Sequence, residues 1–135
     1  MASETTDKPM EPTGTLAVAL DHAAKLLADN PALAEEQARE ILKVMPRQLE
    51  ATLILAKASR RKGDSEAARK AAEAAIGAAP KSAEAHFELG LAQAALGKGL
   101  RAIKSLERAV SLKPDMANAW RALGDQLTLA GEADA

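Results

Sequence analysis

The stretch AEAHFELGLAQAALGKGLRAIKSLERAVSLKP, residues 83–114, contains two helix-forming segments separated by a glycine-rich turn. The first segment, residues 83–96, ends at Gly97, because a residue without a side chain suits the left-handed conformation that closes many helices. The second segment, about residues 100–112, ends before Pro114, since the residue preceding a proline avoids the helical region. The stretch therefore predicts an antiparallel pair of helices.

The proline and the glycine that end these two segments recur every 34 residues along the chain. Prolines and glycines both follow this period, and Asp29 takes the place of the glycine in the first period. A fixed period of this length is typical of an array of stacked helix pairs. The prolines are Pro12, Pro46, Pro80 and Pro114, and the glycines are Gly63, Gly97 and Gly131.

The period divides the chain into repeating units. We predict an all-α fold, a right-handed α-solenoid of antiparallel helix pairs with about 3.5 units and seven helices. The repeat domain covers residues 15–135, and residues 1–14, which are polar and contain prolines, are expected to be a flexible leader. The units are residues 15–48, 49–82, 83–116 and a partial unit, 117–135.

Small residues on one face of each second helix explain why the helices stack closely. Alanine and leucine recur at helical spacing in these segments, and small side chains let two helix axes approach to about 8 Å. Alanine makes up 33 of the 135 residues, while Phe87 and Trp120 are the only aromatic residues. The predicted inner faces are Ala68, Ala72 and Ala75 in one unit and Ala102, Leu106 and Ala109 in the next.

Composition excludes several classes of function. The net charge is −1, so no basic field attracts nucleic acid. Uncharged stretches fall far short of the roughly 20 residues that span a bilayer, so we expect no membrane insertion. The chain has no cysteine, which fits a reducing cytoplasm, and we predict a cytoplasmic location.

No group of residues has the pattern of a catalytic or metal site. His22 and His86 lie at non-equivalent places and lack converging partners, so we expect no cofactor, no metal and no enzymatic activity. The GxGxxA motif that begins at Gly97 follows a helix and not a strand, which argues against dinucleotide binding. The basic run of residues 60–62 has two interpretations: contact with a phosphate or an acidic peptide, or solvation of a helix end.

Units two to four resemble the tetratricopeptide repeat signature. The resemblance covers about residues 15–131, but the first unit departs from it, with Asp21, His22 and Lys25 where apolar, small and aromatic residues are usual. The residues that carry the resemblance are Leu89, Gly90, Gly97, Ala102, Leu106, Ala109 and Pro114, with Trp120, Leu123 and Gly124 in the last unit.

This resemblance implies a concave groove, lined by the first helices, that holds a peptide or helix of a partner protein. We expect Phe87 to be the aromatic anchor of this groove. One subfamily clamps the terminal carboxylate of heat-shock chaperones with basic residues, but here Glu84 and Glu88 stand at those places and would repel it. The implied groove residues are Glu50, Leu53, Lys57, Arg60, Glu84, Phe87, Leu91, Asn118, Arg121 and Asp125.

A second resemblance suggests an alternative function. The segments HFELGLAQAALG, residues 86–97, and AWRALGDQLTLAG, residues 119–131, are similar to the repeats that precede a sulfotransferase domain in bacterial proteins. This resemblance implies a bacterial, non-catalytic accessory or oligomerisation domain of an enzyme. No residue of this chain matches the phosphate-binding loop of those enzymes, so no catalytic role is assigned.

An apolar stripe is predicted on the last helix. Trp120, Leu123 and Leu127 lie at i, i+3 and i+7 and form this stripe. We expect the helix to end at Gly131 and the stripe to be covered by weak self-association, and we expect the chain to be the front part of a longer protein.

Overall fold

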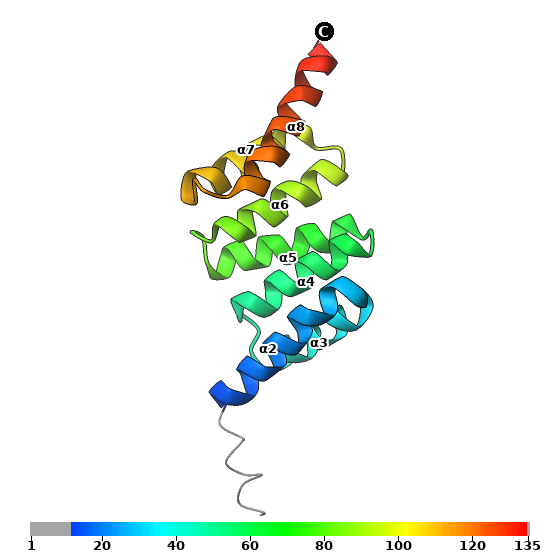
Figure 1. The fold of residues 1–135 in the computed structure, drawn as a ribbon, viewed down its shortest axis with the longest axis vertical. Coiled ribbons are helices and arrows are strands. Elements are labelled where there is room, and N and C mark those ends of the chain that lie inside the picture. Colours follow the sequence, from blue (N-terminus) through cyan, green and yellow to red (C-terminus); the bar gives the residue numbers. More distant parts are fainter. Residues whose placement is uncertain (1–11, 135) are drawn as a thin grey trace, which may run out of the picture.

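The computed structural model describes residues 12–134, and the side chains of residues 15–132. This part of the chain consists of seven α-helices and contains no strand, which confirms the predicted all-α fold (Figure 1). Residues 1–11, which belong to the expected leader, lie outside the described residues. The helices are α2 (Pro12–Asp29), α3 (Pro31–Val44), α4 (Leu49–Arg61), α5 (Ser65–Ala78), α6 (Ala83–Ala95), α7 (Gly99–Leu112) and α8 (Ala117–Asp134).

Short polar side chains and two glycines define the turns between these helices. The side chains of Asn30, Asp64 and Ser82 each accept a hydrogen bond of 3.1 Å from the backbone N–H three residues later. Such caps satisfy donors that have no partner within the helix. Gly63 and Gly97 have φ angles of 85° and 79°, in the left-handed region. The predicted turns of the second and third units are confirmed.

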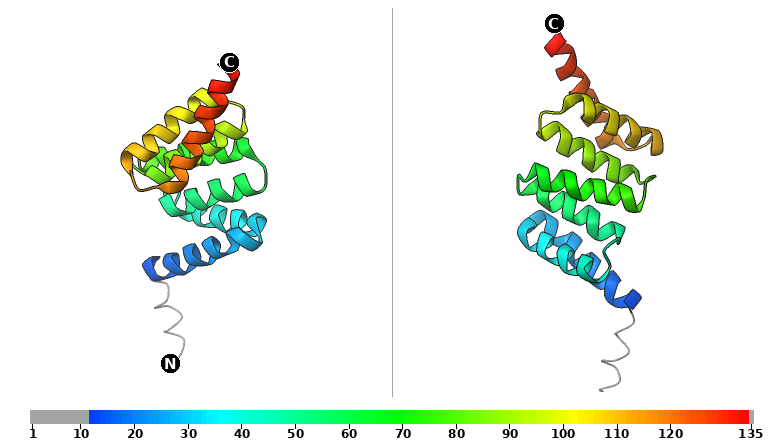
Figure 2. Two further views of the ribbon diagram at one scale, coloured as in Figure 1. Left: turned by 45° about the horizontal axis from the view of Figure 1, so that its top comes forward. Right: turned by 180° about the vertical axis from the view of Figure 1, so that it is seen from behind.

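The helices form two layers that run along the length of the molecule (Figures 1 and 2). The first helices α2, α4, α6 and α8 contact one another in sequence, and each second helix packs between the first helix of its own unit and that of the next. Among the described residues, no two of the second helices α3, α5 and α7 have backbones in contact. The first helices therefore make up the inner, concave layer of a helical solenoid.

Small side chains bring the two helices of a unit together, as the sequence predicts. The alanines on the inner faces of α5 and α7 are buried, and Leu106 is fully buried. Leu106 lies against Gly90 of α6, where a Cβ atom would stand 2.7 Å from the Leu106 Cγ. Gly90 is thus required by close packing and not by its backbone conformation.

Gly90→Ala is expected to destabilise the fold by about 1–3 kcal/mol, because the added methyl group overpacks the contact with Leu106. The matched control is Gly124→Ala, one period later, where a Cβ would meet nothing within 4 Å. There the better helix propensity of alanine should stabilise the helix by up to about 1 kcal/mol. Urea denaturation followed by circular dichroism measures both changes. Equal effects at the two positions would contradict the packing argument.

Two helix ends differ from the sequence prediction. Helix α2 begins at Pro12, so the last three residues of the expected leader are helical. Helix α8 continues through Gly131 to Asp134, so the helix end predicted at Gly131 is wrong. A glycine permits a left-handed turn but does not force one, and Gly131 does not have a positive φ.

The predicted stripe of the last helix is divided between two faces. Leu123 is buried against α7 in the core, whereas the side chains of Trp120 and Leu127 are each 50% exposed. Within residues 12–134, no helix is long and apolar enough to cross a membrane.

Candidate functional site

Two adjoining hollows lie on the inner layer of first helices. The first, of about 400 Å³, lies chiefly between α2 and α4, and the second, of about 350 Å³, continues toward α6 and the start of α8. Ala24, Lys57 and Glu84 line both hollows, so together they form one continuous depression, which we call the concave groove. Its lining also includes Ala17, Leu20, Asp21, Leu27, Ala28, Glu50, Leu53, Ile54, Arg60, Arg61, Phe87, Glu88, Met116 and Asn118.

Most of the groove residues expected from the sequence line this groove. Three do not: Leu91 packs against the core near Phe87, and Arg121 and Asp125 lie exposed on α8, away from the two hollows. The residues that the structure places in the groove as expected are Glu50, Leu53, Lys57, Arg60, Glu84, Phe87 and Asn118.

Phe87 lines the groove and is also part of the core. Its side chain is only 8% exposed and belongs to the core cluster formed by α6, α7 and α8. In this cluster it packs with Leu106, Val110 and Leu123. A ring buried in this way has little surface left for a partner. The main role of the ring is therefore in the core, and its role as the aromatic anchor of the groove stays a prediction.

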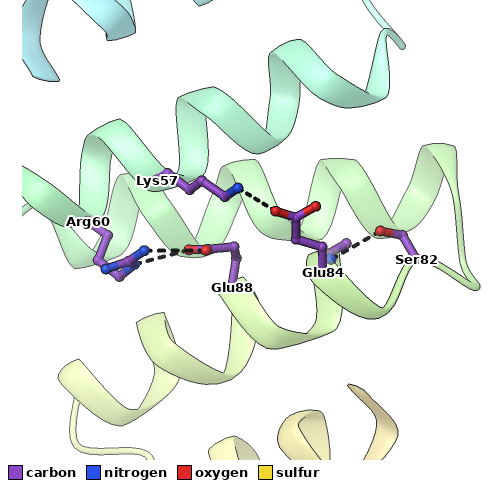
Figure 3. A network of polar contacts seen from close by, with 6 residues as sticks. Lys57, Arg60, Ser82, Glu84 and Glu88 are labelled. Atoms are coloured by element: carbon purple, nitrogen blue, oxygen red, sulfur yellow. Dashed lines mark hydrogen bonds and ion pairs between the residues drawn. The ribbon is translucent and has the colours of Figure 1, made fainter. Parts of the chain in front are cut away.

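Two ion pairs connect α4 to α6 along the groove (Figure 3). Lys57 donates to Glu84, and Arg60 donates from Nε to Glu88 Oε1 at 3.0 Å and from Nη2 to Oε2 at 3.3 Å. Glu84 is about half exposed, whereas Glu88 is only 2% exposed. The two acids that the sequence shows as free negative charges are thus both paired, and Glu88 is a buried structural ion.

The basic run of residues 60–62 is occupied by contacts within the chain. Arg60 pairs with Glu88, Arg61 donates to the Leu27 carbonyl oxygen at 3.1 Å, and Lys62 donates to Glu35. Hydrogen bonds from Lys62 and then Arg39 hold the pKa of the Glu35 carboxyl below its ordinary value. These residues tie α4 to α2, α3 and α6, so neither interpretation from the sequence describes them fully.

The histidines have structural partners. His22 Nδ1 lies 3.0 Å from Gln37 Oε1, and His86 Nε2 lies 2.9 Å from the carbonyl oxygen of Pro80. Trp120 donates to the Pro114 carbonyl oxygen at 2.7 Å, which is the equivalent contact one period later. Among the side chains that the structure describes, no group of three or more histidines and acids is placed to hold a metal ion.

Helix α2 supplies groove residues that sequence reasoning missed. Leu20 and Ala24 line the groove from α2, although the first unit departs from the repeat pattern. One residue, Asn30, connects α2 to α3, whereas residues 62–64 connect α4 to α5. The shorter connection changes the register of α2, so counting by the period does not find these residues. The spacing of Leu20 and Ala24 at i and i+4 is the sequence feature that could have identified them.

Comparisons with known proteins agree with this architecture. Residues 2–99 match the family described as the second ARM domain of tetratricopeptide repeat protein 21, and residues 87–135 match the tetratricopeptide repeat. No curated protein sequence matches the chain.

Solved structures show the same arrangement of helices. A mutant O-GlcNAc transferase of Thermobaculum terrenum is 26% identical with a TM-score of 0.83, over 87% of this chain and 23% of that one. The Sgt2 repeat domain of Aspergillus fumigatus is 21% identical with a TM-score of 0.83, over 87% and 80% of the two chains. The first repeat domain of Spaghetti (RPAP3), bound to an HSP90 peptide, is 20% identical with a TM-score of 0.80, over 85% and 92%. The last two likenesses show the fold alone.

Proposed function

The chain belongs to the tetratricopeptide repeat family, and from this premise we propose that it is a non-catalytic scaffold that binds a partner protein. Its concave groove holds a peptide segment or a helix of that partner. The observation that carries the proposal is the continuous groove between α2, α4 and α6, which has an apolar floor and charged edges. Such an arrangement of apolar centre and polar rim is typical of protein interfaces.

The lining of the groove suggests the chemistry of the partner. The exposed alanines Ala17 and Ala24 form an apolar strip in the first hollow, which Leu20, Leu53 and Ile54 also line although each is less than a tenth exposed. Three acidic residues and one basic residue surround this strip. The basic residue, Lys57, is already paired with Glu84. We infer that the partner segment offers apolar side chains to the strip and a basic side chain to the acidic edge, where Glu50 is exposed.

This lining argues against a chaperone tail as the ligand. The Spaghetti domain is bound to the HSP90 peptide SRMEEVD, which carries several carboxylates. In this chain the bases that face the groove at Lys57 and Arg60 are engaged by Glu84 and Glu88. An acidic peptide would have to displace these pairs, so we expect it not to bind.

The alternative predicted from the sequence is an accessory domain of a sulfotransferase. The comparisons give this link no support. The chain spans 23% of the O-GlcNAc transferase that it resembles in structure, and what that enzyme does is a property of the whole protein. The sulfotransferase alternative stays a prediction.

Filling the groove is expected to abolish partner binding without unfolding the protein. Ala24 is exposed and lines both hollows, so Ala24→Trp places a large ring in the groove and leaves the core intact. Peptides selected from a displayed random library against the wild-type chain should bind Ala24→Trp about tenfold more weakly or worse by calorimetry. The matched control is Ala74→Trp, an exposed alanine on the second helix α5, which should leave affinity unchanged.

The same selection tests the inferred chemistry of the partner. Enriched peptides should combine apolar residues with lysine or arginine, and SRMEEVD should show no binding. Enrichment of acidic peptides, or equal affinity of Ala24→Trp and the wild type for the selected peptides, would contradict the proposal.

A further inference from the structure

The exposed face of α8 corresponds to a face that is covered elsewhere in the array. In α6, Gly90 lies against Leu106 of α7. The equivalent residue of α8, Gly124, has nothing within 4 Å of the place of a Cβ atom. Helix α8 packs on α7 through Ala119 and Leu123, and the face that carries Gly124 is open.

Four residues form a stripe along this open face, which we call the α8 stripe. They are Trp120, Gly124, Leu127 and Gly131, separated by four, three and four residues. This is the spacing of a helix–helix seam, in which large side chains insert into gaps on the facing helix. All four residues are exposed, and neither glycine has a positive φ.

The stripe alternates large and small residues in a way that is complementary to itself. If a second α8 lies antiparallel across the stripe, Trp120 and Gly131 of the two copies face each other, because they are equally far from the stripe's midpoint. Leu127 and Gly124 face each other for the same reason. A parallel arrangement would instead set tryptophan against tryptophan and glycine against glycine, leaving gaps.

The charges of α8 favour the same orientation. The stripe itself has no charged residue, so pairing does not bury a charge. Arg121 is the only basic residue of α8. An antiparallel arrangement brings Arg121 of each copy within a helical turn of the level of Glu132 of the other, whereas a parallel one sets the two Arg121 side chains side by side.

We propose that the α8 stripe is the contact surface for a second copy of this chain, joined by an antiparallel α8–α8 seam with Trp120 and Leu127 inserted over Gly131 and Gly124. The seam is short, about 27 Å for the whole helix of 18 residues, so the dimer is weak and dissociates on dilution. The two hollows of the concave groove lie elsewhere on the inner layer, so the dimer does not depend on the peptide-binding function.

Sedimentation equilibrium from low micromolar to millimolar concentration tests the seam. The wild-type mass should rise from 14.1 kDa toward twice that value. Gly124→Leu fills the gap at a place where a Cβ atom meets nothing within 4 Å, and Leu127→Glu puts a charge into the seam. Each should raise the dissociation constant about tenfold or more.

Matched controls use open positions far from α8. Gly77→Leu also adds a side chain where a Cβ meets nothing within 4 Å, and Val18→Glu also charges an exposed apolar residue. Both should dimerise as the wild type does. A strictly monomeric wild type, or dimerisation that survives both α8 variants, would overturn the proposal.

Cysteine cross-linking determines the orientation, since the chain has no cysteine of its own. Gly124→Cys mixed with Leu127→Cys should form a mixed disulfide dimer under mild oxidation, and neither variant should cross-link well alone. Efficient cross-linking of Leu127→Cys with itself would show a parallel seam and overturn the antiparallel arrangement.

Discussion

Phe87→Ala is expected to lower the free energy of unfolding by about 3–5 kcal/mol. The ring is nearly fully buried where α6, α7 and α8 meet, so its removal leaves a cavity lined by Leu106, Val110 and Leu123. The cost contains both the lost burial of the ring and the cavity that the neighbours cannot close. Urea denaturation monitored by circular dichroism measures the change.

The helices that Phe87→Ala destabilises can also be predicted. Each unit of a solenoid contacts only its neighbours, so damage at one unit spreads little. Hydrogen exchange should therefore quicken in α7 and α8, while α2 and α3, which belong to a separate core cluster, stay protected. Phe87→Leu, which keeps most of the volume, should cost less than about 1.5 kcal/mol.

This experiment separates a core residue from a groove anchor. If Phe87→Ala leaves stability unchanged and weakens only the binding of a selected peptide, the ring is not part of the core. The peptide affinity of Ala24→Trp provides the comparison, because that variant fills the groove without opening a cavity.

The helices of the second and third units could be predicted from the sequence because their limits are local features. Gly63 and Gly97 turn the chain, and Asp64 and Ser82 cap α5 and α6, each within two residues of the helix end that it defines. The period repeats these features, so one unit predicts the next. Prediction failed at Gly131, through which α8 continues, and it missed the groove residues of α2, which a single residue, Asn30, connects to α3.

The candidate site was predictable in outline but not in the role of each side chain. Leu53, Phe87 and Arg121 occupy equivalent positions of successive first helices, so the period assigns them the same place. The structure buries the first two and exposes the third, because burial depends on what the neighbouring helices offer. A repeat pattern indicates the face on which a residue lies and not how deeply it is covered.

The ion pairs between units could not be predicted from the sequence either. Arg60 and Glu88 are 28 residues apart, and Lys57 and Glu84 are 27 apart, so only the packing of α4 on α6 brings them together. The sequence alone shows Glu84 and Glu88 as free charges that would repel a carboxylate. In the structure, these two acids pair with Lys57 and Arg60, the bases that an acidic ligand would need.

Arg60→Ala is expected to destabilise the fold by about 2–3 kcal/mol. Removing one partner of a fully buried ion pair costs about 3–5 kcal/mol because the remaining charge has lost its compensation. Here Glu88 is buried but Arg60 is about one-third exposed, so water screens part of the interaction and the cost is lower. Urea denaturation measures the difference between the variant and the wild type.

Lys57→Ala is the matched control, since it removes a neighbouring ion pair between the same two helices. Glu84, its partner, is about half exposed and becomes hydrated when the lysine is lost, so the cost should stay below about 1 kcal/mol. The double variant Arg60→Met with Glu88→Leu should recover most of the stability, because it removes both charges and fills the space with apolar groups. If Arg60→Ala costs no more than Lys57→Ala, Glu88 is reached by water. In that case the Arg60–Glu88 pair is not what holds α4 and α6 at the spacing that forms the groove.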